Sequence, residues 1–554
     1  MLRLKDLYAG PATSAAPSEA PGEGPRALSL AAPAKGHYVV EARQRLSRSI
    51  LWKAQRRYFH EQGIAAWRSA TVPHYVTSNP ALASAYAEVV LGFLRDLRPD
   101  EADGQPLYIV ELGAGSGRFG FLFLRALLDL QRRSPLRGVR FKYVMTDFTE
   151  TNLAFWRAHE ALAPLVAEGV LDFALFDAEQ DASIRLLHGG ETITPGSLRS
   201  PLVVIANYVF DGISQDAFTF EKGRIHECLV SLHSTKLEPD LSDPDMIGRL
   251  AVDYSRRPAP ADCYPEPAFN DILQGYAREL DGETVLFPCT ALRCIQRLAD
   301  LAGGRLLLLS GDKGGVRVES LRDQDMPSMS VHGSFSLMVN YHAIGEYVRG
   351  QGGQVLSMKK RNAHLTVSAF LLGAPPAGSP ETRLAFEQSV DRAAPDDFFT
   401  LRRGIQRKYE QLDLEHLVSL VHLSRHDPKI FRDGLPVILG KLEALTEPLR
   451  LDLIAAAHEV WANYYHIGEE PDLAFLTGVL LYELADHEGA LAMFERSLHL
   501  YGNDQAARWN MGMCHYALGQ PDRAAACLAE AAAIDPQFRD LRPLQMKREL
   551  LAEG

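Results

Sequence analysis

Three glycines spaced two residues apart are the feature of this sequence best suited to chemistry. Glu111-Leu-Gly-Ala-Gly-Ser-Gly117 follows the apolar run Leu107–Val110. The apolar run predicts a buried strand, the glycines predict a tight turn, and residues 119–130 predict the start of a helix. Because glycine has no Cβ, backbone N–H groups in such a turn can approach a ligand closely. We therefore expect this turn to bind a small molecule.

The spacing of the glycines separates several kinds of binding turn. A dinucleotide site has the pattern G-x-G-x-x-G, whereas this turn is G-x-G-x-G, with Arg118 where the third glycine of that pattern would fall. A phosphate-binding P-loop is excluded because no Gly-Lys-Ser/Thr follows. The pattern Glu-x-Gly-x-Gly-x-Gly after a strand resembles motif I of class I S-adenosylmethionine-dependent methyltransferases. An ordinary turn between a strand and a helix is the alternative.

This resemblance implies a cofactor, S-adenosyl-L-methionine, and a set of residues that hold it. Its methionine part and ribose would lie over the turn formed by Gly113, Ala114, Gly115 and Gly117. Glu111 is expected to fix the geometry of this turn by accepting hydrogen bonds from backbone N–H groups.

Two acids that follow later predicted strands could hold the rest of the cofactor. Asp147 ends the run Tyr143–Asp147 and could accept both ribose hydroxyls, as acids do in dinucleotide sites. The alternative for Asp147 is the N-cap of the next helix. Asp177 follows the third strand, where methyltransferases commonly hold the adenine amino group.

The fourth predicted strand ends in Asn207-Tyr-Val-Phe-Asp211, where a polar side chain would face the transferred methyl group. Asn207 with Phe210 is similar to the Asn-x-x-aromatic motif of amino-group methyltransferases, which orients a nitrogen nucleophile. Methyl transfer from a sulfonium needs alignment, and a base only if the nucleophile arrives protonated. Asp211 and Glu227 are acids that follow this strand end in sequence and are the candidate bases. The alternative makes Asn207 a turn former and Asp211 a helix cap.

The apolar, β-rich runs alternate with helix-like stretches, which predicts a mostly parallel, doubly wound α/β sheet of Rossmann-like type. The predicted strands are residues 108–111, 141–146, 171–176, 202–206, 217–220, 227–232 and 305–310. Ligands bind beyond the carboxyl ends of strands in such sheets, and each candidate residue follows such an end. Residues 38–70 are expected to be helical, with the basic residues Arg43, Arg45, Arg48, Lys53, Arg56 and Arg57 on a solvated face.

Composition and charge restrict the class of protein. The chain has 554 residues and a net charge of −12, which argues against a general nucleic-acid binder. Six cysteines form no C-x-x-C pair and no zinc-like cluster, so we expect reduced thiols, no metal and a cytoplasmic protein. The sequence has no apolar run of about 20 residues that could cross a bilayer. Residues 1–37 are expected to be disordered, and an organelle transit peptide is the minority alternative.

Two domains are expected after the N-terminal segment: a methyltransferase domain at 38–372 and a helical domain at 399–554, joined by a loop-like linker at 373–398. Gly478, Leu484, Ala490 and Leu500 recur 34 residues later as Gly512, Leu518, Ala524 and Ile534. A 34-residue period of helical pairs is similar to tetratricopeptide repeats, here at about 471–504 and 505–538. A plain helical bundle is the alternative.

The order of motifs resembles the MidA-like methyltransferase family, which includes the mitochondrial arginine methyltransferase that assists assembly of respiratory complex I. The segments that carry the resemblance are His74–Pro80, Ala85–Glu88, Glu111–Gly117, Ala206–Asp211, Arg224–Glu227 and Ser334–Asn340. Departures occur at Tyr208, where the family has Glu, at Ser214 and at Gly311-Asp-Lys-Gly314. Tyr208 removes a natural partner for a guanidinium, so an acceptor other than arginine is expected.

Three functions follow from these patterns. The first is a methyltransferase for a protein or peptide that the helical repeats recruit, since stacked repeats offer a concave surface to extended peptides. The second is a small-molecule methyltransferase whose repeats serve oligomerisation. The third is a non-catalytic repeat scaffold with a retired methyltransferase fold.

Overall fold

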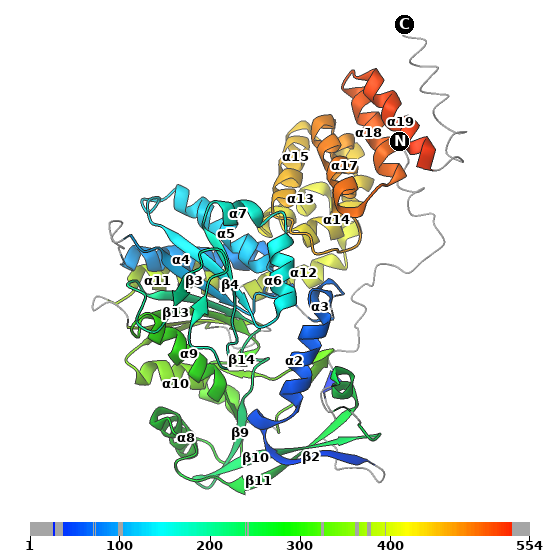
Figure 1. Cartoon of the computed structure of the whole chain (residues 1–554). Helices are drawn as coiled ribbons and strands as arrows, with labels where there is room; N and C mark the ends of the chain where they lie inside the picture. Colours follow the sequence, from blue (N-terminus) through cyan, green and yellow to red (C-terminus); the bar gives the residue numbers. More distant parts are fainter. Residues whose placement is uncertain are drawn as a thin grey trace. The chain divides into compact units, whose positions relative to one another are not determined.

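The computed structural model describes residues 26–27, 37–69, 71–72, 74–97, 104–238, 240, 243–322, 326–359, 365–373, 378–393 and 395–534 (Figure 1). The described chain forms two compact units, one within residues 23–400 and one from Leu401 onward. The segment predicted to be disordered lies outside the described residues except for 26–27 and 37.

The larger unit is built on a seven-stranded sheet with the order β18-β19-β13-β8-β3-β4-β5. Its strands are β3 Leu107–Leu112, β4 Phe141–Asp147, β5 Leu171–Leu175, β8 Leu202–Asn207, β13 Leu306–Asp312, β18 Gln354–Ser357 and β19 Thr366–Leu372. The strands from β13 to β5 are parallel, whereas β19 is antiparallel to both of its neighbours. The chain progresses outward from β3 to β5 and then returns to β8 on the other side of β3. The topological switch point, where ligands bind in such sheets, therefore lies between β3 and β8.

Five of the predicted strands are confirmed in this sheet to within two residues: 108–111, 141–146, 171–176, 202–206 and 305–310. Nearly all of their side chains are buried because helices cover both faces of the sheet.

Helices on the two faces give the doubly wound α/β arrangement that the sequence predicts (Figure 1). The helices α9 Cys289–Leu301 and α10 Tyr341–Gly350 share one core with Val110, Val204 and Leu308 of the sheet. On the opposite face, α5 Arg118–Arg132 packs Phe123 against Tyr143 of β4, with ring centroids 5.3 Å apart. Helix α4 Pro80–Leu97 packs beside α5. Further elements are α6 Glu150–Ala158, α7 Ala163–Ala167, α8 Pro267–Glu279, β1 Arg26–Ala27, β6 Ile184–Arg185, β7 Thr192–Ile193, β14 Gly314–Gly315, β15 Ser330–His332, β16 Ser334–Ser336 and β17 Val339–Asn340.

The two remaining predicted strands, 217–220 and 227–232, lie in a second sheet that is antiparallel, so their expected place in the parallel sheet is wrong. This sheet has the order β11 Leu250–Pro258, β10 Arg224–Ser234, β9 Asp216–Glu221 and β12 Thr284–Phe287, with β2 Tyr38–Arg45 also paired to β10. The physical reason is the connection between β9 and β10. Lys222 and Gly223 have φ of 50° and 74°, a two-residue hairpin turn that makes its flanking strands antiparallel.

The helix predicted over residues 38–70 is wrong for 38–45, which form β2, and correct for α2 Leu51–Gln62 and α3 Ala65–Arg68. The β-branched and aromatic residues at the start of this segment satisfy their backbone by pairing with β10, and this tertiary contact decides the conformation. The expected solvated face is also wrong for two of its arginines. Arg45 forms an ion pair with Asp216, and Arg56 forms one with Asp177.

Within the predicted linker at 373–398, residues 380–392 are helical, whereas the sequence predicts a loop. Helix α11 Pro380–Phe386 continues as a π-helical turn, Glu387–Arg392, and packs against α4. Pro380 occupies the first turn, where it is well tolerated, and Asp96 of α4 accepts hydrogen bonds from the backbone N–H groups of Glu381 and Thr382 at 3.1 and 2.8 Å. This external cap turns a Pro-containing segment into a helix.

The second unit is all-helical, as the sequence predicts. Its helices are α12 Pro395–Gln406, which begins before Leu401, α13 Leu414–Leu423, α14 Pro428–Gly440, α15 Glu447–Ala462, α16 Leu473–Glu483, α17 His487–Tyr501, α18 Gln505–Ala517 and α19 Pro521–Ile534. The pairs α16/α17 and α18/α19 fall within the two predicted repeats. The end of the second predicted repeat, which contains Pro536, lies outside the described residues. A Cβ on Gly478 would lie 2.8 Å from the ring of Phe494, and one on Gly512 would lie 2.9 Å from Leu528. Both pairs of helices therefore approach closely at equivalent positions, 34 residues apart.

We predict that Gly478→Val lowers the free energy of unfolding of the helical unit by about 1–3 kcal/mol, because the side chain overpacks the contact with buried Phe494. Gly404→Val is the matched control, since a Cβ at Gly404 in α12 has open space around it. Urea unfolding followed by far-UV circular dichroism measures both variants. Equal stability of the two would contradict the close packing of α16 on α17.

Candidate active site

The glycine turn after β3 has the conformation that its sequence requires. Gly113, Gly115 and Gly117 have φ of 56°, 54° and 82°, in the left-handed region that favours glycine. The N–H of Gly117 donates to the carbonyl of Ala114 at 2.8 Å and closes the turn. The N–H of Ala114 donates to the carbonyl of Thr146 at 2.9 Å, which ties the turn to the end of β4. Helix α5 then begins at Arg118.

Asp147, at the carboxyl end of β4, is buried and organises this edge of the sheet. Its carboxylate accepts hydrogen bonds from the backbone N–H groups of Gly115 and Thr149 at 3.3 and 3.0 Å, from Thr149 Oγ1 at 2.9 Å and from Asn152 Nδ2 at 3.0 Å. Burial raises the pKa of Asp147, and these hydrogen bonds oppose the rise. The residue at the N-cap of α6 is Thr149 rather than Asp147. The ribose role of Asp147 stays a prediction.

Glu111 is also buried, and its partner differs from the expected one. Its Oε2 accepts a hydrogen bond from the Tyr143 hydroxyl at 2.8 Å, in place of the expected backbone N–H groups. Burial raises the pKa of Glu111 to about 8, Tyr143 lowers it, and the nearby charge of Asp147 raises it further. A Cβ on Gly120 of α5 would lie 2.8 Å from the same Oε2, so this carboxyl packs directly against the first turn of α5. Glu111 therefore supports the glycine turn by packing, as a carboxyl that keeps its proton at neutral pH.

Asn207 ends β8 beside the glycine turn. Its Oδ1 accepts a hydrogen bond from the Tyr86 hydroxyl of α4 at 2.9 Å, whereas its buried Nδ2 has no hydrogen-bond partner. A buried donor without a partner costs about 1–3 kcal/mol, so it marks a place where a ligand acceptor would be favourable. Tyr208 has φ of 52°, a strained conformation for a non-glycine residue that is typical of functional sites. A Cβ on Gly113 would lie 3.2 Å from Val209, so the turn and this strand end are in contact.

Asp211 lies next to a second buried acid, Asp312, at the end of the adjacent strand β13. The backbone N–H of Asp211 donates to Asp312 Oδ2 at 3.1 Å, and the N–H of Lys313 donates to Asp312 Oδ1 at 2.7 Å. Burial raises the pKa of Asp211 to about 7, with Lys313 opposing the rise. Burial and the neighbouring Asp211 raise the pKa of Asp312 well above its usual range. Both carboxyls therefore hold a proton more tightly than an exposed aspartate does.

Glu227 lies in the antiparallel sheet, and its choice as a base stays a prediction. It is buried on β10, where Arg45 lies 3.4 Å from Oε1 and Arg257 forms a further ion pair with Oε2. Asp216 and Tyr264 complete this second cluster, with the Tyr264 hydroxyl 2.6 Å from Asp216. Two cations therefore balance the charge of Glu227.

Asp177 follows β5, as predicted, and its carboxylate is engaged by Arg56 of α2 at 3.3 and 2.7 Å. The same guanidinium lies over the ring of Phe148, 4.5 Å from its centroid. From α3, the indole of Trp67 lies against the glycine turn, since a Cβ on Gly115 would be 2.8 Å from it. Helices α2 and α3 thus reach the edge of the sheet where the cofactor is expected.

The structure therefore brings together the glycine turn, Asp147, Asn207 and Asp211, and it places Asp177 at the end of β5. Sequence reasoning missed Asp312, although it follows a predicted strand just as Asp147 and Asp177 do. It also missed Arg56, Trp67 and Tyr86, for which the sequence carries no local signal. Arg56 is separated from Asp177 by 121 residues, and only the folded chain shows the contact.

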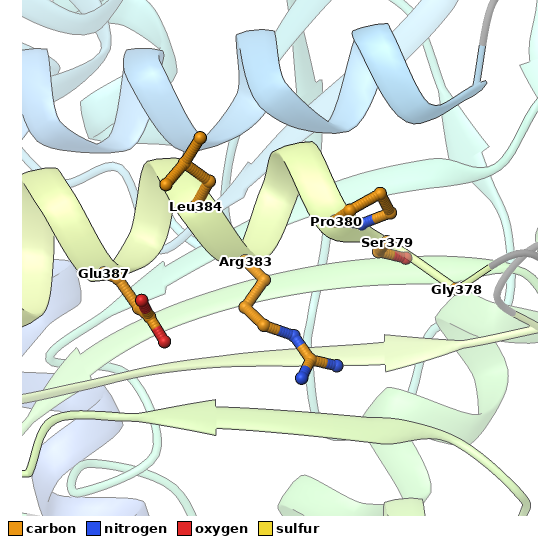
Figure 2. A pocket seen from close by; sticks show the side chains of 6 residues that line it. All are labelled: Gly378, Ser379, Pro380, Arg383, Leu384 and Glu387. Atoms are coloured by element: carbon orange, nitrogen blue, oxygen red, sulfur yellow. The ribbon is translucent and has the colours of Figure 1, made fainter.

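Other features of the described residues offer no competing site. A pocket of about 340 Å³ beside α11 is lined by Gly378, Ser379, Pro380, Arg383, Leu384 and Glu387, and Figure 2 shows Arg383 extending from the helix toward the neighbouring strands. Its residues are none of those predicted to hold the cofactor. Within the described ranges, no group of three or more His, Cys, Asp or Glu side chains is arranged to hold a metal ion. Among the described helices, none has the length and apolarity needed to span a membrane.

Comparisons with known proteins agree with this architecture. A tetratricopeptide repeat family model matches residues 481–547, overlapping both predicted repeats. An uncharacterised superfamily protein from Burkholderia thailandensis shares 16% identity over 61% of this chain and 87% of its own, with a TM-score of 0.37. A second protein from the same organism, described as a likely methyltransferase and bound to S-adenosyl-homocysteine, shares 18% identity over 56% of this chain and 80% of its own. Its TM-score is 0.36. Magnesium protoporphyrin IX methyltransferase from Synechocystis PCC 6803 shares 13% identity over 57% of this chain and 97% of its own, with a TM-score of 0.26.

At TM-scores of 0.37 and below, these likenesses carry no weight for the site. The assignment of the fold rests on the strand order of the chain itself, with its parallel strands, its one antiparallel strand β19 and its switch point at the glycine turn. The larger unit has a Rossmann-like methyltransferase fold, and the second unit is all-helical, with a tetratricopeptide repeat match over residues 481–547.

The buried Glu111 predicts a dependence of stability on pH. Because its pKa is about 8 when folded and 4.5 when exposed, the folded chain holds a proton that the unfolded chain releases between these values. Stability therefore falls as the pH rises through this window. Between pH 4.5 and pH 8, the free energy of unfolding of Glu111→Gln should fall by about 2–5 kcal/mol less than that of the wild type. Urea unfolding across this pH range measures the difference.

The control is Glu150→Gln, which removes the same charge from an exposed position in the first turn of α6. It should keep the pH dependence of the wild type. If Glu111→Gln also keeps it, Glu111 does not hold a proton in the folded chain.

Proposed function

We propose that this protein is an S-adenosyl-L-methionine-dependent methyltransferase. The observation that supports this most directly is the unpartnered Nδ2 of Asn207 beside a turn of three left-handed glycines, at the switch point of the sheet. Because the turn carries no Cβ at its glycines, a ligand can approach its backbone once the Trp67 indole moves away, and the buried amide offers the ligand a donor. The residues of this edge thus fit the cofactor that the glycine spacing implies.

Four groups of this chain would hold the cofactor. The backbone from Gly113 to Gly117, including Ala114, would lie beneath its methionine part and ribose, Asp147 would accept from the ribose hydroxyls, and Asp177 would accept from the adenine amino group. Asn207 would face the reacting end. Bound S-adenosyl-L-methionine supplies a methyl group carried on a positively charged sulfur. Asp147 and Glu111 keep the turn in shape, Asp147 through its hydrogen bond from the Gly115 N–H and Glu111 through the packing beneath α5.

The acceptor side would lie over Asn207, Asp211 and Asp312. Register pairs Asn207 with Gly311, and a Cβ at Gly311 would meet the Tyr86 hydroxyl at 2.8 Å and Asn207 Oδ1 at 2.9 Å. The absence of a side chain at Gly311 keeps this space for the amide and the phenol. Beside it, Asp211, whose pKa burial raises to about 7, can take one proton from a protonated nucleophile. This favours an amine or another nitrogen acceptor, oriented by Asn207.

The repeats favour a protein or peptide as the methyl acceptor. Stacked helical pairs present an extended surface suited to polypeptides, and such a unit adds nothing to the chemistry of the sheet edge. With Tyr208 in place of an acid, the acceptor differs from the arginine of the MidA-like relatives that the sequence resembles. Six free cysteines, four of them buried, support a reducing compartment such as the cytoplasm.

Gly115→Arg should abolish binding of S-adenosyl-homocysteine, because the side chain fills the turn and φ at this position is unfavourable for any residue but glycine. Isothermal titration measures the binding. The matched control is Gly196→Arg, where φ is 74° and a side chain meets open space. If Gly115→Arg binds as the wild type does, the glycine turn is not the cofactor site.

Removal of residues 401–554 tests recruitment by the repeats. If the repeats deliver a protein acceptor, transfer of a labelled methyl group to proteins of a cell extract should fall at least tenfold. Binding of S-adenosyl-homocysteine by the truncated chain should be unchanged, which serves as the control for folding. Undiminished labelling of the same proteins would contradict recruitment, and labelling of small molecules alone would favour the small-molecule alternative.

A further inference from the structure

The contacts of Arg56 reproduce those expected of an adenine ring. Its guanidinium is planar, stacks over Phe148 at 4.5 Å and donates two hydrogen bonds to Asp177 at 3.3 and 2.7 Å. Asp177 follows β5 and Phe148 follows β4, so both stand at the carboxyl edge of the sheet. An adenine in this place would also stack on the aromatic ring and donate its amino group to the carboxylate. Arg56 and an adenine therefore cannot occupy these contacts at the same time.

A second contact from the same segment covers the glycine turn. The indole of Trp67 lies so close to Gly115 that a Cβ there would be within 2.8 Å of it. The indole also stacks on Phe59 of α2, with centroids 6.0 Å apart, and Phe59 meets Phe148 edge-on at 6.5 Å. These rings join α2, α3 and the end of β4 into one aromatic cluster over the edge of the sheet.

The start of this segment is buried more completely than its end. In the first turns of α2, Leu51, Trp52 and Ala54 are buried in the core of the antiparallel sheet, and Trp52 packs against Phe335. Toward the end of α2 and in α3, Arg56, Phe59 and Trp67 are half-exposed, although Tyr58 and Ala66 remain buried. Figure 1 shows α2 leading from the antiparallel sheet toward α3.

The joint between the two helices has a residue suited to a hinge. Gly63 caps α2 with φ of 46° and ψ of −134°, a conformation open to glycine. Hinge residues absorb such backbone changes at the ends of elements. Rotation about Gly63 can thus move α3 without disturbing α2, and the half-exposed side chain of Arg56 can leave Asp177 by rotating about its own side-chain bonds.

We propose that Arg56 is an affinity determinant of the cofactor site: it occupies the adenine position on Asp177 and Phe148. For the cofactor to bind, the segment from Arg56 to Arg68 must open, through rotation of the Arg56 side chain away from Asp177 and movement of α3 about Gly63. This rests on the proposed function. The ion pair is partly exposed, with side-chain exposures of 32% and 18%, so it biases the closed state without locking it. The affinity of the wild type is therefore reduced by the fraction of molecules in which the segment is closed.

Arg56→Ala tests this with S-adenosyl-homocysteine as the probe in isothermal titration of the full chain. Removing the competing guanidinium should tighten binding by about three- to tenfold. The control is Arg57→Ala, which removes the same charge from the next residue, whose exposed guanidinium pairs with Glu61 and Asp240. The control should bind as the wild type does.

The outcomes separate this inference from the proposed function. Equal affinities of the wild type and Arg56→Ala would overturn the competition by Arg56 and leave the cofactor site intact. Weaker binding by Arg56→Ala would also overturn it, because Arg56 would then be a contact of the cofactor. No binding by either protein at millimolar probe would overturn the proposed function and the inference together.

A measurement on the wild type needs no variant. Amide hydrogen exchange of residues 63–68 should become faster when S-adenosyl-homocysteine is added, because α3 leaves the edge of the sheet. Exchange at residues 113–117 should become slower in the same sample. If both segments are protected, α3 is a fixed wall of the site, and the swinging segment is wrong.

Discussion

The hydrogen bond from the Gly115 N–H to the buried carboxylate of Asp147 is the contact on which the geometry of this site depends. The three glycines lie in a conformation that the isolated chain has no reason to hold, and the carboxylate fixes it from the neighbouring strand. The same carboxylate accepts from Thr149 and Asn152, so it sets the start of α6 as well. Together with the hydrogen bond from the Ala114 N–H to the Thr146 carbonyl, it ties the end of β3 to the end of β4.

Burial of acids is the second constraint on this edge of the sheet. Glu111, Asp147 and Asp312 are buried and Asp211 is half-buried, and burial raises the pKa of each of them. Their environments differ in the partners they provide. Asp147 accepts four hydrogen bonds, whereas Asp312 accepts from the backbone N–H groups of Asp211 and Lys313. Asp147 is thus held against the glycine turn, and Asp211 and Asp312 hold protons more tightly than exposed acids do.

The sequence predicts the parts of this fold that depend on local patterns. The apolar runs of β3, β4 and β8 are buried on both faces, and such runs are recognisable without knowledge of their neighbours. The glycine turn, Asp147 and Asn207 follow from their positions after these runs. Local patterns do not predict residues 38–45 as a strand, because pairing with β10 decides their conformation. They also do not place β9 and β10 in an antiparallel sheet, which the Lys222-Gly223 turn decides.

The rest of the site could not be read from the sequence because its contacts join distant segments. Arg56 reads as a surface residue of an amphipathic helix until Asp177 and Phe148 are seen beside it. Glu227 is near Asn207 in sequence order, yet Arg45 and Arg257 hold it in another sheet. Asp312 is different, because the rule that selected Asp147 and Asp177 would also have selected it.

The central claim is that the glycine turn and Asn207 bind S-adenosyl-L-methionine. A crystal structure of the full chain with S-adenosyl-homocysteine tests this most directly. The account predicts the methionine part of the ligand over Gly113–Gly117, an acceptor atom of the ligand on Asn207 Nδ2, and the adenine against Phe148 and Asp177. Ligand density elsewhere on the chain, or none at all with the turn unchanged, would contradict it.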